Sequence, residues 1–163
     1  MIHLIVGNTG SGKTTYATSL KKKVGGLLFS IDTWNNTLFL KDKTSNDGLP
    51  WMLERIDRGE KMMMNLIEQL EAIHVDSILD LGLSKFEHRE KFRSFARQNN
   101  FKTKMHFLDI DKDIRWERIQ HRNNTKGATF EFEVTLENFE FMEEWFEKPD
   151  ELEMQNGLTI QTN

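Results

Sequence analysis

The stretch of sequence that decides the fold is Met1–Thr14, which reads MIHLIVGNTGSGKT. The apolar run over residues 2–6 predicts a buried strand, and the helical pattern that starts at Lys13 predicts a helix directly after it. Between the two, Gly7 to Thr14 match the pattern G-x-x-x-x-G-K-[ST] at every position. Glycines let the backbone wrap around a phosphate group with its N–H groups pointing inward, and the helix start adds the positive end of its dipole. The stretch therefore predicts a phosphate-binding loop (P-loop) for a nucleoside triphosphate.

The residues of this loop have predicted roles. Lys13 should bridge the terminal phosphates and act in catalysis, and the Thr14 hydroxyl should bind Mg²⁺. Contacts with the nucleotide are expected from Gly7, Asn8, Thr9, Gly10, Ser11, Gly12, Lys13, Thr14 and Thr15.

The rest of the chain alternates short apolar runs with longer amphipathic segments, which is typical of an α/β fold with a parallel sheet. The length of 163 residues predicts one domain. Strands are expected at 2–6, 27–31, 77–81, 104–108 and 158–160, with a short extended stretch over 130–134. Helices are expected at 13–23, from Pro50 onward with a kink or break at Gly59, and at 86–98, 114–122 and 135–147.

Composition excludes several classes of protein. The chain has no cysteine, which excludes disulfides, thiol catalysis and cysteine-bound metals and is consistent with a cytoplasmic location. It has no apolar run of the roughly 18 residues that a transmembrane helix needs. The apolar run at the N-terminus is too short for a signal peptide. We therefore expect a cytoplasmic protein that does not act at a membrane.

Charge is unevenly distributed along the chain. Residues 128–153 hold ten acids and one base, a net charge of −9, so the remainder of the chain carries +5 of the total of −4. One interpretation is a solvated acidic face on the helix at 135–147. The other is a helix that packs over a basic cleft and regulates access to it. Neither supports broad nucleic-acid binding, which needs a strongly basic surface.

Two acids follow predicted strands. Asp32 follows the second strand and Asp80 lies at the end of the third, and in an open parallel sheet ligands bind beyond these strand ends. Asp32 is predicted to take the proton of an acceptor hydroxyl, with a helix or turn cap as the alternative. Asp80 is predicted to orient Mg²⁺ together with Thr14, with a structural hydrogen bond to the P-loop backbone as the alternative.

Three arginines share one face of a predicted helix. Arg115, Arg118 and Arg122 are spaced i, i+3 and i+7, and the helix face that they share shows no acidic partner. Such a stripe suits a polyphosphate, since planar guanidinium groups match its oxygens. Arg115 is expected to contact the nucleotide, and Arg118 and Arg122 to act in catalysis from a lid over residues 112–128. An ordinary solvated helix is the alternative.

Several other P-loop classes lack support. A guanine-reading NKxD and a DxxG switch are absent, which argues against a GTPase switch. The third strand has no glutamate after Asp80, as a motor ATPase would require. A small kinase fits the remaining features, because it needs an acid near the acceptor and cations at the phosphates.

Three aromatic residues follow Asp32 in the sequence: Trp34, Phe39 and Trp51. We expect them either to stack on a ring of the acceptor or to pack in the core or a lid.

Four segments together carry a resemblance: GNTGSGKT at 7–14, Asp32, ILDLG at 78–82 and RWERIQHRN at 115–123. With these, the chain resembles the small bacterial P-loop kinases of the AAA-type ATP-binding family. That group is related to zeta toxins, chloramphenicol phosphotransferase and the kinase domain of phage polynucleotide kinase. The resemblance implies a five-stranded sheet in the order 2-3-1-4-5 and the cofactors ATP and Mg²⁺. It also implies Asp32 as the acceptor-activating acid and Arg118 and Arg122 as lid arginines.

The expected function is therefore an ATP-dependent kinase that phosphorylates a hydroxyl group of a small molecule. One alternative is an ATP-binding or ATP-hydrolysing switch, or a partner-binding module, without a separate acceptor. Another is a polynucleotide 5′-hydroxyl kinase. Polynucleotide kinases carry an arginine three residues after the acid, and this chain has Asn35 there, which argues against a nucleic-acid acceptor.

Overall fold

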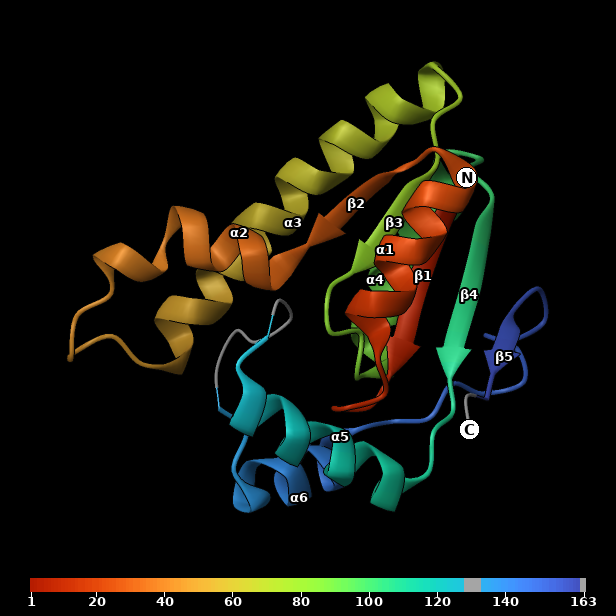
Figure 1. Cartoon of the computed structure of the whole chain (residues 1–163). Helices are drawn as coiled ribbons and strands as arrows, with labels where there is room; N and C mark the ends of the chain where they lie inside the picture. Colours follow the sequence, from red (N-terminus) through yellow and green to blue (C-terminus); the bar gives the residue numbers. More distant parts are fainter. Residues whose placement is uncertain (128–132, 162–163) are drawn as a thin grey trace.

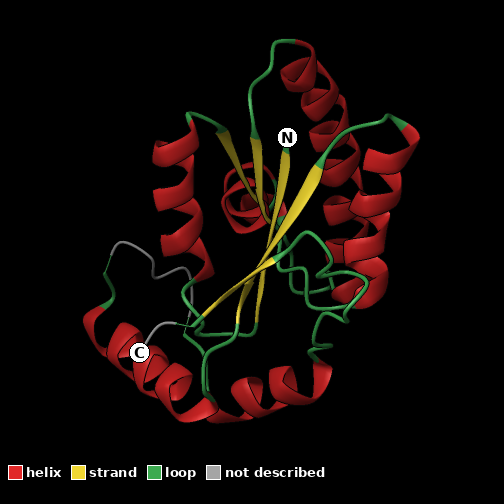
Figure 2. Cartoon of the chain, turned by 90° about the vertical axis from the view of Figure 1, so that its right-hand side faces the viewer, coloured by secondary structure: helices red, strands yellow, loops and turns green. Residues whose placement is uncertain are grey.

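Five parallel strands form the centre of the molecule in the order β2-β3-β1-β4-β5, with helices on both faces (Figures 1 and 2). The computed structural model describes residues 1–127 and 133–161. This architecture confirms the predicted fold class and strand order, while most of the extended stretch expected over 130–134 lies outside the described residues. The strands are β1 (Ile2–Gly7), β2 (Leu27–Ser30), β3 (Ser77–Asp80), β4 (Thr103–Leu108) and β5 (Leu158–Ile160).

Strand β1 is buried along its whole length because it pairs with β3 on one side and β4 on the other. Successive side chains of a strand point to opposite faces. Leu4 and Val6 accordingly pack into one apolar cluster, and Ile5 packs into a second cluster together with Ala17 of the first helix. The P-loop thus starts from a buried strand that is paired on both sides.

Helices lie at all the predicted places, most of them with shifted ends, and two more helices over residues 31–42 lie in a stretch that was predicted as the end of a strand and a loop. The helices are α1 (Lys13–Val24), α2 (Ile31–Leu38), the short 3-10 helix η1 (Leu40–Asp42), α3 (Leu49–Ala72), α4 (Phe86–Gln98), α5 (Lys112–Thr125) and α6 (Leu136–Trp145). Helix α3 runs unbroken through Gly59, which is buried. Within the described ranges, none of these helices has the length and apolar character needed to cross a membrane.

The end of β2 differs from the prediction. The strand was expected to run to Ile31 and to be followed by a loop, but it stops at Ser30 and α2 begins at once. The reason is a helix cap: the Ser30 hydroxyl oxygen accepts a hydrogen bond from the backbone N–H of Thr33. Asp32 therefore lies in the first turn of α2. Since Ser30 supplies the cap, the side chain of Asp32 is not needed for it.

Helices α5 and α6 pack against each other at the lower end of the molecule in Figure 1. Thr135 caps α6 as predicted, accepting a hydrogen bond from the backbone N–H of Asn138 at 3.2 Å. Trp116 of α5 and Phe139 of α6 have ring centroids 5.2 Å apart. The acidic segment is therefore packed against the arginine-bearing helix.

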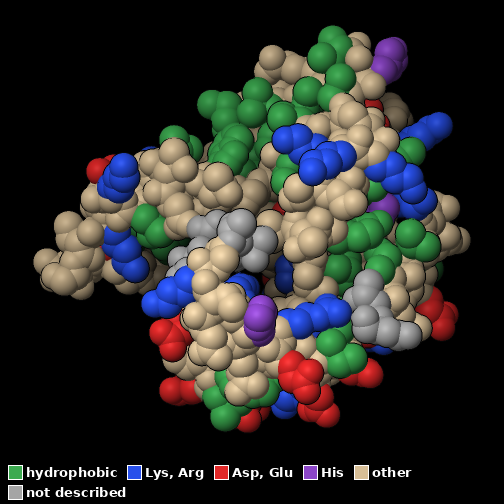
Figure 3. All heavy atoms as spheres, in the orientation of Figure 1, with side chains coloured by type: hydrophobic (Ala, Val, Ile, Leu, Met, Phe, Trp, Pro, Cys, Tyr) green, Lys and Arg blue, Asp and Glu red, His purple; other side chains and the backbone are tan. Residues whose placement is uncertain are grey.

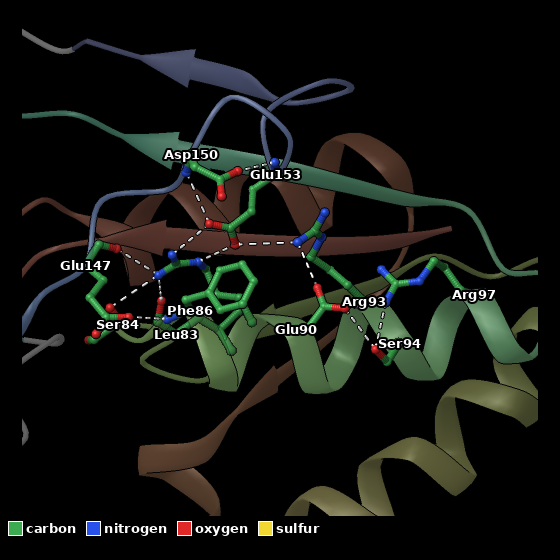
Figure 4. A network of polar contacts seen from close by, with 11 residues as sticks. Leu83, Ser84, Phe86, Glu90, Arg93, Ser94, Arg97, Glu147, Asp150 and Glu153 are labelled. Carbon is green, nitrogen blue, oxygen red and sulfur yellow. Dashed lines mark hydrogen bonds and ion pairs between the residues drawn. The ribbon is translucent and has the colours of Figure 1, made fainter.

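The chain after α6 returns to the sheet and is held there by Arg89. Figure 4 shows the polar network of this region, with Ser84, Glu147 and Glu153 among the labelled residues. Arg89 is fully buried, and its guanidinium donates two hydrogen bonds to Glu153, at 2.7 and 2.9 Å. It also donates to the carbonyl oxygens of Leu83, Ser84 and Glu147. One buried cation thus ties the C-terminal segment to the loop between β3 and α4.

Candidate active site

A cavity of about 630 Å³ lies beyond the carboxyl ends of β1, β2 and β3. Lys and Arg side chains gather around a hollow in the middle of the face seen in Figure 3. The P-loop, the start of α2, the loop after β3, and helices α5 and α6 all contribute to the cavity wall. The lining residues are Thr9, Gly10, Gly12, Lys13, Thr14, Thr15, Asp32, Asp80, Gly82, Ser84, Arg118, Ile119, His121, Arg122, Thr125, Gly127, Val134, Asn138, Phe141 and Met142.

The P-loop glycines are required by the backbone path. Gly10 and Gly12 have φ angles of 83° and 90°, in the left-handed region that favours glycine. A Cβ atom on Gly10 would also lie 2.6 Å from the carbonyl oxygen of Arg115. A Cβ on Gly7 would lie 2.6 Å from Ser11 Oγ. Gly7, Asn8 and Ser11, which were expected to contact the nucleotide, are outside the described cavity lining.

Lys13 is held over the loop that it follows. Its Nζ donates a hydrogen bond to the carbonyl oxygen of Asn8 at 3.1 Å. Burial lowers the pKa of Lys13, while the negative charges of Asp80 and Asp32 act in the opposite direction. An ammonium group in this place is suited to meet phosphate oxygens, because an incoming anion would compensate the burial of its charge.

Thr14 and Asp80 bring two side-chain oxygens together at the cavity wall. The Thr14 hydroxyl donates a hydrogen bond to Asp80 Oδ2 at 2.8 Å. The described residues contain no group of three or more His, Asp or Glu side chains that could hold a metal ion alone. A Mg²⁺ ion fits this arrangement, since it usually takes one or two protein oxygens and completes its shell with phosphate oxygens and water.

Asp32 lines the same cavity as Lys13. Its negative charge acts to raise the pKa values of both Lys13 and Arg122, so the three charged groups lie within electrostatic reach of one another. Asp32 reaches this place from α2 and Asp80 from β3, because Ser30 and Asp80 are register partners on neighbouring parallel strands.

Arg118 and Arg122 line the cavity from α5, as the stripe of arginines predicts. Burial lowers the pKa of Arg122, and the charge of Asp32 opposes that shift. Arg122 Nε is buried and has no hydrogen-bond partner among residues 1–127 and 133–161. A buried donor without a partner has a strong preference for an acceptor, which an anionic ligand in this cavity would supply.

Arg115 lies elsewhere, and the acidic partner that its own helix face lacks comes from α6. Its side chain is buried, and its guanidinium pairs with both carboxylate oxygens of Glu143 at 2.6 and 2.8 Å. It also donates to the carbonyl oxygens of Ile110 and Thr9. The described cavity lining does not include Arg115. The interactions of Arg115 place it behind the P-loop as a support.

Glu143 is a supporting residue beside the P-loop that the sequence analysis missed. Besides pairing with Arg115, it accepts a hydrogen bond from Asn8 Nδ2 at 2.5 Å. Asn8 Oδ1 in turn accepts from the backbone N–H of Thr9 at 2.7 Å. The acidic helix α6 is thus joined to the P-loop by charge-assisted contacts. The available signal was the acidic run itself, interpreted as a helix that packs over a basic cleft.

Comparison with protein families gives one match. The family described as "AAA domain" matches residues 2–149, which is most of the chain. No curated protein matches this sequence.

Solved structures share the fold at low sequence identity. A putative kinase from Chloroflexus aurantiacus has a TM-score of 0.72 and 17% identity, over 99% of this chain and 87% of that one. Kti12 of Chaetomium thermophilum in complex with ADP-AlF3 has a TM-score of 0.68 and 15% identity, over 99% and 89%. The APS kinase of Mycobacterium tuberculosis in complex with AMPPNP and APS has a TM-score of 0.65 and 16% identity, over 99% and 88%.

Proposed function

Because the chain belongs to the AAA domain family and has a P-loop kinase fold, we propose that it is an ATP-dependent phosphotransferase. It transfers the γ-phosphoryl group of ATP to a hydroxyl group of a small molecule. The main observation behind this proposal is that Lys13, Asp32 and Arg122 all line one cavity. A module that only binds a nucleotide does not need a carboxylate in the cavity of the P-loop lysine, and here Asp32 lines that cavity from the start of α2.

Each group has a step to perform. The P-loop amides and Lys13 hold the phosphates of ATP. The acceptor oxygen forms a bond to the γ-phosphorus as the bond from that phosphorus to the β–γ bridging oxygen breaks, and ADP leaves. Asp32 takes the proton that the acceptor hydroxyl loses. Arg118 and Arg122 neutralise charge on the phosphoryl group while it moves between the two oxygens.

Thr14 and Asp80 are the residues that would hold Mg²⁺. When bound, the ion supplies charge neutralisation at the β- and γ-phosphate oxygens. The hydrogen bond between the two residues keeps their oxygens together before a nucleotide arrives.

A second candidate is ATP hydrolysis without a separate acceptor, as in a switch or a partner-binding module. This second candidate is retained because one of the similar structures, Kti12 bound to ADP-AlF3, is not named as a kinase. A polynucleotide kinase is less well supported, because Asn35, which stands where those enzymes have an arginine, is buried. The kinship with zeta toxins and chloramphenicol phosphotransferase and the cytoplasmic location stay predictions from the sequence.

The test compares the wild type with Asp32→Asn. Binding of ATP is measured by calorimetry, and transfer of label from ATP is screened against sugars, nucleosides, antibiotics and oligonucleotide 5′ ends. Asp32→Asn should bind ATP with near-normal affinity and transfer phosphate roughly 10²–10⁴-fold more slowly, the usual span for one acid–base group. The matched control is Asp42→Asn, on the exposed helix η1, which should change neither property.

Two outcomes would contradict the proposal in different ways. Full transfer activity in Asp32→Asn would remove Asp32 as the base while leaving the kinase in place. Steady hydrolysis of ATP by the wild type, with no acceptor phosphorylated, would favour the second candidate.

A further inference from the structure

Helix α6 presents the apolar side chains of Phe141 and Met142 at the cavity. Phe141 and Met142 belong to its lining, together with the amide side chain of Asn138. One turn further on, Trp145 stacks against Phe141 with ring centroids 5.8 Å apart and planes 22° apart. Phe141 is 58% exposed and Trp145 is 45% exposed. Large apolar side chains left open beside a polar site usually mark a surface that binds something. We call these four residues the aromatic face.

The aromatic face lies on the acceptor side of the cavity. Lys85 Nζ lies 4.3 Å from the ring centroid of Trp145, and Lys85 follows Ser84 in the loop after β3. The backbone N–H of Glu147 donates to Ser84 O, which fixes the end of α6 against that loop. In the sheet, β3 stands between β1, which leads into the P-loop, and β2, which leads to Asp32. The aromatic face thus lies beside the end of β3, which stands between the P-loop and Asp32.

Charge around this face disfavours an ionic ligand. The aromatic face residues in the cavity lining, Asn138, Phe141 and Met142, and the lining residues Ile119 and Val134 are uncharged, while the lining cations Arg118 and Arg122 of α5 are assigned to the phosphoryl group. Lys85 is already paired with Glu147 at 3.0 Å. A charged group stacked on Phe141 would lose its water without gaining a partner from this face, which is costly.

The surroundings of the face are acidic. Acidic side chains gather around the lower end of the molecule in Figure 3, where α5 and α6 lie. Glu137, Glu140 and Glu144 of α6 are exposed there. They would repel a polyanion such as an oligonucleotide.

Other aromatic residues do not offer such a face. Trp34, Phe39 and Trp51 were considered for stacking on an acceptor ring, but the described cavity lining includes none of them. Trp34 packs against Phe29 of the core, and the guanidinium of Arg55 covers the ring of Trp51 at 3.7 Å.

We propose that the aromatic face binds the acceptor, and that the acceptor is an uncharged hydroxyl compound carrying a flat apolar ring. This inference rests on the proposed kinase function and names the substrate class of the same site. Stacking on Phe141 holds the ring, and the Asn138 amide is available to a polar substituent. The hydroxyl group then points along the cavity toward Asp32 and the γ-phosphate.

Three glucosides that differ only in one substituent test the proposal. Phenyl β-D-glucoside carries the ring, methyl β-D-glucoside lacks it, and 4-carboxyphenyl β-D-glucoside adds a negative charge to it. Binding is measured by calorimetry with AMPPNP and Mg²⁺ at saturating concentration, so that no turnover occurs and the nucleotide site is filled. The proteins are the wild type, Phe141→Ala and Leu136→Ala. Leu136 is the matched control, because it is 52% exposed on the same helix and outside the described cavity lining.

The phenyl compound should bind the wild type roughly tenfold more tightly than the methyl compound, a preference of the size expected for aromatic stacking. The carboxylate should abolish this preference, Phe141→Ala should remove it, and Leu136→Ala should keep it. Equal affinity for the phenyl and methyl compounds, tighter binding of the carboxylate, full preference in Phe141→Ala, or no binding of the phenyl compound would each overturn the proposal. Failure of AMPPNP to bind the wild type would instead overturn the proposed function, and the glucoside preference is then measured without nucleotide.

Discussion

Replacement of Glu143 by alanine should destabilise the protein and disturb the P-loop together. Glu143 accepts two hydrogen bonds from Arg115 and one from Asn8. The Arg115 side chain is 6% exposed, so it would keep a buried charge without its carboxylate. Removing one partner of a buried ion pair costs about 3–5 kcal/mol. We expect about 3 kcal/mol here, the lower end, because the Glu143 side chain is 22% exposed.

Two measurements follow from this estimate. At about 2–4 °C per kcal/mol for a chain of this size, the melting temperature should fall by about 6–12 °C. The affinity for AMPPNP, measured well below the melting transition, should also fall, because Asn8 loses its partner and Arg115, which donates to the Thr9 carbonyl oxygen, loses the carboxylate that holds it. Glu144→Ala is the control: it removes the neighbouring exposed acid and should change stability by less than about 0.5 kcal/mol.

A double-mutant cycle decides whether the effect comes through Arg115. In an Arg115→Met background the buried charge is absent, so Glu143→Ala should then cost less than about 1 kcal/mol. An equal cost in both backgrounds would refute the reasoning, as would unchanged AMPPNP affinity in a folded Glu143→Ala protein.

Three further predictions concern individual groups. Lys13→Ala should reduce ATP turnover by orders of magnitude with little change in melting temperature. Unchanged turnover would rule out the P-loop as the working site. Arg122→Ala should slow phosphoryl transfer more than it weakens ATP binding, because a cation on the moving phosphoryl acts in the transition state. A loss of thermal stability alone would make this arginine structural. Burial, then the charges of His3 and Lys104, lowers the pKa of His106 to about 4. The unfolded chain takes up this proton near pH 6.5, so the free energy of unfolding should fall as the pH drops from 6.5 toward 4, by up to about 3 kcal/mol. Urea unfolding between pH 7 and pH 4.5 tests this, and an equally steep loss in His106→Gln would contradict it.

The elements that depend on local chemistry could be predicted from the sequence. The P-loop was predictable because left-handed glycines, a lysine and a hydroxyl must stand in one order along a few residues. Helix α4 was predicted with its observed bounds, since its apolar period and the following asparagines are local signals. The end of β2 was misplaced because a serine that caps a helix and a serine that ends a strand look alike in sequence. The cap formed by Ser30 is visible only once the backbone path is known.

The contacts between distant segments could not be predicted. Arg115 was expected to meet a ligand because the sequence around it shows no acid on its helix face, but its partner Glu143 lies 28 residues further along. The fully buried pair of Arg89 and Glu153 spans 64 residues. Whether a charged side chain faces water, a ligand or another buried charge is decided by the packing of whole elements. Periodicity and spacing carry no information about that packing.

The ion pair between Arg89 and Glu153 affects the order in which parts of the chain fold during synthesis. β1, near the start of the chain, has both its neighbours much later, with Ile2 in register with Ser77 and Thr103. The P-loop acquires its last support only when Glu143 has been made, and the C-terminal segment closes only when Glu153 has been made. Pairing between such distant segments is slow, and chains that wait for it expose strand edges and apolar surface. During synthesis, the P-loop is therefore made well before the segments that hold it in its final conformation.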